Sequence, residues 1–307
     1  MIKTEHLTKR YGPLMAADDV TFEVGPGEVL GFLGPNGAGK TTTMRMLAGF
    51  VTPTSGSGSI CGHDIGSDTL AAKRVLGYLP EGAPSYGEMT VRAFLAFIAD
   101  LRALEGERRG ARLAHVIEHL HLGGVLEQTI DTLSKGFRRR VGLAQAIVHD
   151  PPVLILDEPT DGLDPNQKHE VRTLINDMAR DKIIVISTHI LEEVDAVCTR
   201  AIIIARGRIV ADDTPAGLAA RSRYHNAVSM QLDDPTQLTA ARAAVASLPT
   251  VADLEVSERD ARLTALPKAG ATILPALSEL AVRQGLKLKE LHLESGRLDE
   301  VFRTITA

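Results

Sequence analysis

The segment GPNGAGKTT, residues 34–42, constrains the fold of this chain more than any other part of the sequence. A short apolar run, residues 29–33, precedes it, and KTTTMRMLAGF follows with apolar residues at helical spacing. Strand, glycine-rich loop and helix together match the pattern G-x-x-x-x-G-K-[ST]. In that pattern the backbone N–H groups and the helix N-terminus converge on phosphate oxygens. The sequence therefore predicts a loop that binds a nucleoside triphosphate, with Lys40 on the β and γ phosphates and the Thr41 hydroxyl on Mg²⁺.

Two adjacent acids follow a second apolar run. The run VLILD, residues 153–157, is typical of a buried strand and places Asp157 at its end, where a carboxylate can hold the Mg²⁺ shell. Glu158 comes next and is positioned to orient or deprotonate an attacking water. A solvated turn is the ordinary alternative for two such acids. The four apolar residues before them, in a chain with a phosphate-binding loop, favour the catalytic interpretation.

The chain of 307 residues is expected to form two domains. Apolar runs such as IIVIS, residues 183–187, alternate with helical stretches, which predicts buried parallel strands in an α/β domain over residues 1–222. Residues 88–148 have helical spacing and form an expected insert. Residues 225–307 follow the order β-α-β-β-α-β of a ferredoxin-like α+β unit, with a helix from Pro235 and a last short helix from Leu298.

Composition narrows the class of protein. The net charge of -5 argues against a protein that lives on nucleic acid, which needs a basic face. No apolar run approaches the roughly 18 residues needed to span a bilayer, and the start has no signal-peptide pattern. Two cysteines fit a reducing cytosol. RNA binding by the second domain is disfavoured because no aromatic residue occurs between Tyr224 and Phe302, which leaves a regulatory or dimerising role.

These motifs make residues 1 to about 215 resemble an ATP-binding subunit of an ABC transporter. Tyr11 in KRYG matches the family's adenine-stacking aromatic residue, and the glycine-rich loop matches Walker A. The pair at the end of VLILDE matches Walker B and the catalytic glutamate. LSKGF, residues 133–137, occupies the signature position. DGLD, which ends at Asp164, matches the D-loop, and His189 in ISTH matches the switch histidine that touches the γ-phosphate.

The resemblance implies an ATP hydrolase that forms a homodimer or a heterodimer, closes head to tail around two ATP molecules with Mg²⁺, and drives export through integral-membrane permease subunits. Such a protein is expected in the cytoplasm, peripheral on the inner face of the membrane, with no nucleic-acid partner. The residue roles that it implies are catalysis by Glu158, His189 and Lys40; ATP binding by Tyr11, Gly34, Pro35, Asn36, Gly37, Ala38, Gly39, Lys40, Thr41 and Thr42; contact across the dimer by the signature residues Ser134, Lys135 and Gly136; the D-loop position by Asp164; and Mg²⁺ binding by Thr41, Asp157 and Glu81.

Two positions depart from the family pattern. The usual signature is LSGGQ, whereas Lys135 and Phe137 stand here, and the run KGFRRR adds positive charge. Its arginines form either a solvated basic helix face or a phosphate-facing group. Glu81 replaces the usual Gln that contacts Mg²⁺, and it is either a metal-sensing carboxylate or a solvent-facing loop residue.

Within the family, the motifs look most like exporters of the ABC-2 kind, including gliding-motility ATPases. The alternative is a soluble ABC ATPase that acts on ribosomes or nucleic acid; a third interpretation, a silent nucleotide-binding scaffold, is opposed by the retained Glu158 and His189. Three histidines, His115, His119 and His121, are expected on an exposed helix face rather than at a metal, because no recognisable ligand spacing completes them.

Overall fold

The computed structural model describes residues 1–83 and 85–306. Within it the chain divides into two compact units, Met1–Thr214 and Pro215–Ile305. Ala307, the last residue of the expected second domain, lies outside the described residues. In the described part of the chain, no helix combines the length and the apolar character needed to cross a membrane.

A six-stranded sheet forms the centre of the first unit. Its inner strands pair in parallel, and only β10 runs antiparallel to its neighbour. Every residue of β3, β7 and β8 is buried, which explains why these strands are continuously apolar in sequence. The predicted α/β fold is confirmed. In sheet order the strands are β10 (Arg208–Asp213), β9 (Arg200–Ala205), β3 (Val29–Leu33), β8 (Ile183–Thr188), β7 (Val153–Asp157) and β6 (Leu76–Leu79).

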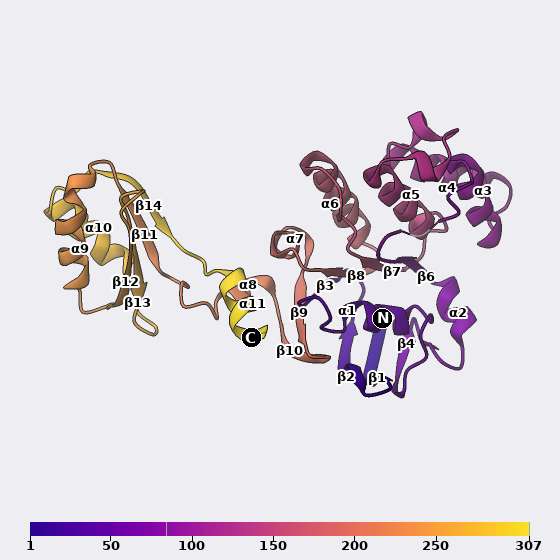
Figure 1. Ribbon diagram of the computed structural model, residues 1–307, viewed down its shortest axis with the longest axis horizontal. Coiled ribbons are helices and arrows are strands. Elements are labelled where there is room, and N and C mark those ends of the chain that lie inside the picture. The colour runs from indigo at the N-terminus through magenta and orange to yellow at the C-terminus, as the bar shows by residue number, and fades with distance from the viewer. Residues whose placement is uncertain (84, 307) are drawn as a thin grey trace. The chain divides into compact units, whose positions relative to one another are not determined.

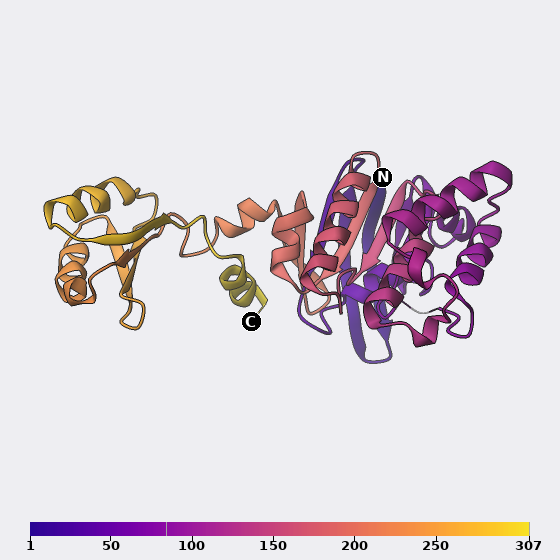
Figure 2. The same cartoon turned by 90° about the horizontal axis from the view of Figure 1, so that it is seen from above.

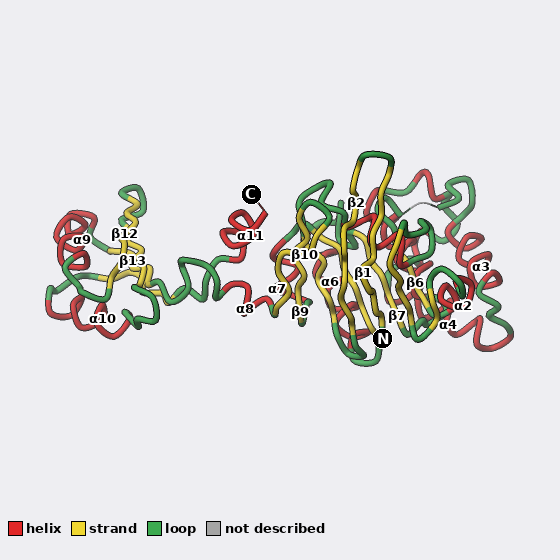
Figure 3. Tube along the Cα trace, turned by 90° about the horizontal axis from the view of Figure 1, so that it is seen from below, coloured by secondary structure: helices red, strands yellow, loops and turns green. Residues whose placement is uncertain are grey.

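An antiparallel sheet, visible as long strands in Figure 3, adds a layer that the sequence analysis did not identify. It shares a core with helix α1 (Lys40–Leu47) and with Phe32, whose ring centroid lies 5.6 Å from that of Phe22. Register shifts along the first two strands interrupt the two-residue alternation that would have revealed them. In sheet order the strands are β2 (Leu14–Val24), β1 (Ile2–Tyr11), β4 (Ser55–Ile60) and β5 (His63–Asp64).

The expected helical insert is present, and its helices α3, α4 and α5 lie together in Figure 1. The Thr90 side chain caps α3 by accepting a hydrogen bond from the Ala93 N–H at 3.2 Å. Buried residues such as Phe94 and Val141 belong to the apolar core on which the helices of the insert pack. Besides α1, the helices of the first unit are α2 (Thr69–Arg74), α3 (Val91–Leu101), α4 (Gly106–His119), α5 (Lys135–Ile147), α6 (Pro165–Ala179) and α7 (Leu191–Val197), with short 3-10 helices at Gly123–Val125 and Ile130–Thr132.

The second unit contains one four-stranded antiparallel sheet in the order β12-β13-β11-β14. Its elements follow the expected β-α-β-β-α-β order, except that the helix predicted from Pro235 begins as a 3-10 turn. Helices α9 and α10 cover one face of the sheet (Figure 2) and share its apolar core. The elements are α8 (Pro215–Ala219), β11 (Val228–Leu232), a 3-10 helix (Pro235–Gln237), α9 (Leu238–Ala246), β12 (Val251–Ser257), β13 (Arg262–Pro267), α10 (Leu274–Arg283), β14 (Leu288–Leu293) and α11 (Leu298–Thr306).

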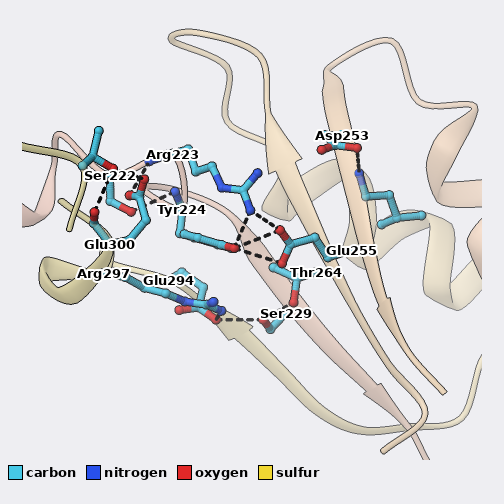
Figure 4. A network of polar contacts seen from close by, with 12 residues as sticks. Ser222, Arg223, Tyr224, Ser229, Asp253, Glu255, Thr264, Glu294, Arg297 and Glu300 are labelled. Carbon is cyan, nitrogen blue, oxygen red and sulfur yellow. Dashed lines mark hydrogen bonds and ion pairs between the residues drawn. The ribbon is translucent and has the colours of Figure 1, made fainter. Parts of the chain in front are cut away.

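In the second unit, a polar network connects the segments before and after the four-stranded sheet to the strands of that sheet (Figure 4). The Tyr224 hydroxyl donates to Glu255 Oε1 on β12 at 2.8 Å. The guanidinium carbons of Arg297 and Arg223 lie 3.7 and 4.8 Å from the Tyr224 ring centroid, as cation–π contacts require. Arg223 also donates to Glu255. One tyrosine ring therefore connects the segment before β11, the segment after β14 and the middle of β12.

Candidate nucleotide-binding site

Four neighbouring strands of the parallel sheet end at the edge where the predicted site residues lie. The register pairs the last residue of β3, Leu33, with Thr188 of β8, and Asp157 of β7 with Ser187. Strand β6 ends beside them, two residues before Glu81. Because parallel strands expose their carboxyl ends on one side, the glycine-rich loop, His189, Glu158 and Glu81 all follow strands that end at this edge.

Close backbone approaches make two glycines of the loop, Gly34 and Gly39, necessary. Gly39 has φ 108°, and a Cβ at this position would lie 2.3 Å from the Ala16 carbonyl oxygen. A Cβ on Gly34 would lie 2.4 Å from the Ile204 carbonyl oxygen. Any larger residue would displace the loop, so its N–H groups are held in place by the surrounding backbone.

Lys40 is a buried cation that donates hydrogen bonds to carbonyl groups of the loop. Its ammonium donates to the carbonyls of Gly34 at 2.6 Å and Pro35 at 3.3 Å, and the residue is 6% exposed. Burial lowers the pKa of Lys40, and the charges of Glu158 and Asp157 act in the opposite direction. Such a partly desolvated ammonium is suited to bind an anion such as a phosphate.

A cavity of about 370 Å³ lies along the loop. It brings Tyr11, Glu81 and Glu158 together with the loop, although these residues are far apart in sequence. Tyr11 leaves much of its ring accessible, and Lys9 Nζ lies 5.0 Å from the ring centroid. The lining residues are Tyr11, Leu14, Ala16, Asn36, Gly37, Ala38, Gly39, Lys40, Thr41, Thr42, Glu81 and Glu158.

Asp157 has one carboxylate oxygen free for a cation. Its Oδ1 accepts a hydrogen bond from the Ser187 hydroxyl, whereas Oδ2 is buried and finds no hydrogen-bond partner in the described part of the chain. A buried, unpaired carboxylate oxygen is costly, and a hydrated Mg²⁺ would satisfy it. Asp157 therefore fits the predicted metal site, together with Thr41 and Glu81 in the neighbouring cavity.

Glu158 and His189 contact each other directly. Glu158 Oε1 and His189 Nδ1 are 2.9 Å apart, with Glu158 largely buried and the imidazole exposed. The Glu158 N–H donates to the Ser187 carbonyl at 3.0 Å, which fixes the backbone of Glu158 at an unusual φ of 53°. The two residues predicted to be catalytic are thus neighbours. Ser187 of β8, which the sequence analysis did not identify, makes hydrogen bonds with both Asp157 and Glu158 at the end of β7.

The signature and D-loop residues do not line this cavity. The Ser134 hydroxyl caps α5 by accepting from the Phe137 N–H at 3.3 Å, and Asp164 caps α6. Lys135 forms an ion pair with Asp161 at 2.9 Å, so the lysine that departs from the family pattern contacts the D-loop of its own chain. Gly136 is buried against Gln167, and a Cβ at this position would lie 2.7 Å from the end of the Gln167 side chain, Oε1.

The solvated-face interpretation of KGFRRR is wrong for two of its three arginines. Arg138 is exposed, but Arg139 and Arg140 are buried. The Arg139 guanidinium donates to the carbonyls of Asp157 at 2.7 Å, of Pro80 at 3.2 Å, and of Glu158. Arg139 therefore connects the signature helix to both acid-bearing strand ends. Its helical spacing to Leu143, four residues later, was the available signal of burial.

His119, the last residue of α4, is exposed as expected; His121 is exposed too but follows the helix, and His115 is half-buried. The rings of His115 and His119 lie 3.9 Å apart between centroids. Within residues 1–83 and 85–306, no group of three or more His, Cys, Asp or Glu side chains is arranged to hold a metal ion.

Comparison with known proteins identifies relatives of the whole chain and of the first unit. The chain is 36% identical over 223 residues to the probable multidrug ABC transporter ATP-binding protein YbhF of Escherichia coli. This aligned region covers 72% of this chain but only 38% of that protein. It is 30% identical over 307 residues to the linearmycin resistance ATP-binding protein LnrL of Bacillus subtilis, over all of this chain and 98% of that one. A solved ATP-binding subunit of an ABC transporter superposes with a TM-score of 0.68 at 30% identity, over 72% of this chain and 92% of that chain.

The match to the family described as ABC transporter extends over residues 17–161. That range contains the glycine-rich loop, the signature segment and the pair Asp157 and Glu158. On these residues and these relatives, the chain belongs to the ABC transporter family, and its first unit is an ABC-type ATPase cassette.

Proposed function

We propose that this chain binds MgATP, closes with a second ATP-binding subunit around two nucleotides, and hydrolyses ATP to drive export through separate integral-membrane subunits. The observation that carries the proposal is the convergence of Lys40, the unpaired Asp157 oxygen and the Glu158–His189 pair at one edge of the sheet. Each part of this arrangement matches one requirement of phosphoryl transfer.

In this proposal the residues of the chain divide the reaction among them. Lys40 and the loop N–H groups bind the β and γ phosphates, and Tyr11 stacks on the base. Mg²⁺, when bound, offsets phosphate charge, with Thr41, Asp157 and Glu81 as the residues to hold it. Glu158 accepts a proton from the attacking water, and His189 exchanges its contact with Glu158 for one with the γ-phosphate.

The proposed dimer follows from the place of the signature segment. Ser134 and Gly136 lie at the N-terminus of α5 but not in the nucleotide cavity of their own chain. A helix N-terminus is a favourable site for an anion because its first N–H groups lack partners within the helix. A second copy placed head to tail, or a related subunit, would bring this helix end to the γ-phosphate.

The proposed membrane partner has a candidate contact surface beside the Glu81 loop. Tyr86 is 61% exposed and Phe97 40% exposed, and their ring centroids lie 5.7 Å apart. Exposed aromatic pairs are enriched where proteins associate. The export direction is supported by likeness to relatives named for multidrug transport and linearmycin resistance. We infer a location on the cytoplasmic face of the membrane from the same relatives.

Two experiments test the proposal. ATP turnover by the purified chain should be measured beside Glu158→Gln, which should still bind ATP but hydrolyse it at least a hundredfold more slowly. Equal rates would reject Glu158 as the base.

A pull-down from detergent-solubilised native membranes, with Tyr86→Ser as the matched variant, should recover a multi-spanning protein with the native chain only. Recovery of ribosomal or chromosomal proteins instead would favour a soluble ABC ATPase.

A further inference from the structure

A buried carboxylate lies behind the Glu158–His189 pair. Glu193, in the first turn of α7, is 2% exposed and belongs to none of the recognised motifs. Its Oε2 accepts a hydrogen bond from the Thr188 hydroxyl at 2.8 Å, and its Oε1 accepts one from the Thr160 hydroxyl. Both threonines are buried as well. Each oxygen of one carboxylate therefore holds a different segment of the chain.

The two threonines flank the catalytic pair. Thr160 lies two residues after Glu158, and Thr188 lies one residue before His189. The same two segments thus make contact twice: on the exposed side through Glu158 Oε1 and His189 Nδ1 at 2.9 Å, and on the buried side through Glu193. The exposed contact must open when His189 turns toward a phosphate, whereas the buried one involves no group that meets the nucleotide.

A charged group at this position is unfavourable for stability. Burial raises the pKa of Glu193, and the hydrogen bond from Thr188 acts against that shift. Among neighbouring charges, Arg172 and Lys168 also favour the ionised form, and Glu158 opposes it. The hydroxyls that donate to Glu193 are neutral, and an apolar side chain of similar size would be less costly in a core. A requirement for two strong acceptors in this place explains the residue better than fold stability does.

We propose that Glu193 is a positioning residue for ATP hydrolysis, which holds the segments of Glu158 and His189 at a fixed separation through Thr160 and Thr188. The inference rests on the proposed roles of Glu158 and His189. While His189 leaves Glu158 for the γ-phosphate, the buried bridge keeps the backbone of both residues in place. Loss of the bridge misplaces the base without removing any group that binds ATP, and displacements of about 1 Å can slow a reaction about a hundredfold.

The first test compares Glu193→Gln with Glu192→Gln, a matched change one residue earlier on the exposed side of the same turn. We expect Glu193→Gln to lower kcat at least tenfold while KM and the dissociation constant for ATP stay within about twofold. Glu192→Gln should match the native chain. A Glu193→Gln protein with native kcat overturns the proposal, and so does an equal loss of ATP affinity and turnover, which indicates a merely structural role.

A second pair of variants covers the case in which Glu193→Gln does not fold. Thr160→Val removes the donor to Glu193 without changing the volume much, and Thr160→Ser keeps it. We expect kcat to fall at least fivefold in the valine variant and to be restored in the serine variant, because the hydroxyl is the group required. Equal kcat values for the two would overturn the inference. If the native chain and Glu158→Gln turned over ATP equally, the proposed function would fail instead, whatever the threonine variants did.

Discussion

The two units of this chain bury different kinds of polar group. The first unit buries six Lys, Arg, His, Asp or Glu side chains among its described residues: Lys40, Arg139, Arg140, His149, Asp157 and Glu193. In the second unit the buried polar residues are Ser222, Ser229 and Thr264, and no Lys, Arg, His, Asp or Glu among its described residues is buried. Ser229 and Thr264 satisfy each other at 3.0 Å.

This difference indicates where the chemistry lies. Buried charges reduce stability unless they are paired, so they persist where a reaction needs them. Paired hydroxyls cost little and only fix the register of a sheet. The first unit therefore carries costly buried charges, of which Lys40 lines the cavity, whereas none of the described charged residues of the second unit is buried. We therefore expect substitutions of buried polar residues in the first unit to have larger effects than substitutions of polar residues in the second unit.

The largest expected effect is the pH dependence of the stability of the first unit, and it comes from the buried imidazole of His149. Burial lowers the pKa of His149 to about 4, so the folded state keeps it neutral while the unfolded state takes up a proton below about pH 6.5. Stability should fall by about 3 kcal/mol as the pH decreases from about 6.5 to 4. His149→Gln, whose amide can donate to the Leu76 carbonyl, should lose this share of the pH dependence in urea unfolding.

The matched change in the second unit is His292→Gln, because His292 is exposed on β14. Its unfolding should follow the native pH dependence. Identical pH slopes for His149→Gln and the native chain would contradict the assignment of a buried neutral imidazole to the first unit.

Lys40→Met should weaken ATP binding about a hundredfold, since it removes a charge-assisted contact of about 2.7 kcal/mol. Isothermal titration calorimetry measures the change, and thermal stabilisation by MgATP should be lost with it. Lys289→Met, an exposed lysine of the second unit, is the control and should bind ATP normally. Native affinity in Lys40→Met would break the link between the buried cation and the nucleotide.

Arg139→Lys should reduce the stability of the first unit by about 2 kcal/mol. The change keeps the charge but loses the fork that reaches the carbonyls of Pro80, Asp157 and Glu158. Denaturant unfolding with Arg138→Lys as the exposed neighbouring control measures the difference. If both variants were equally stable, the guanidinium contacts would contribute nothing beyond charge.

Tyr224→Phe should have the smallest effect, a loss of about 1 kcal/mol confined to the second unit. The change removes the hydroxyl bond to Glu255 and leaves the ring between Arg223 and Arg297. Hydrogen exchange in peptides of β12 should increase, and ATP turnover of the purified chain should stay native. A turnover change of more than twofold would show that the second unit takes part in the reaction, which would break the comparison.

The parts of the site that the sequence revealed are local. The glycine-rich loop, the acids after VLIL and the histidine after IIVIST each carry their meaning within a few residues, because a strand end and the next residues fix the position of the side chain. The order of strands and helices in the second unit was likewise predicted from local patterns of apolar residues.

The parts that the sequence did not reveal depend on distant partners. Arg139 looks like one of three surface arginines until the carbonyls of two strand ends are placed around it. Glu193 looks like one of two adjacent helix acids, and only the fold brings Thr160 to it across 33 positions. Strands β1 and β2 were not predicted because register shifts along them disrupt the alternation of apolar and polar residues. Spacing within a segment can indicate that a side chain such as Arg139 is buried, but it does not identify the distant groups that the side chain contacts.

The backbone of Glu158, at φ 53°, has an evolutionary consequence. Glycine and asparagine adopt this region with far less strain, and a strained residue of this kind costs on the order of 1–3 kcal/mol. A population selected for heat resistance alone would therefore gain by replacing Glu158 with either residue and would lose the carboxylate in doing so. Redesign of this chain for stability should hold position 158 fixed, because the less strained residues there lack the carboxylate that we propose as the base.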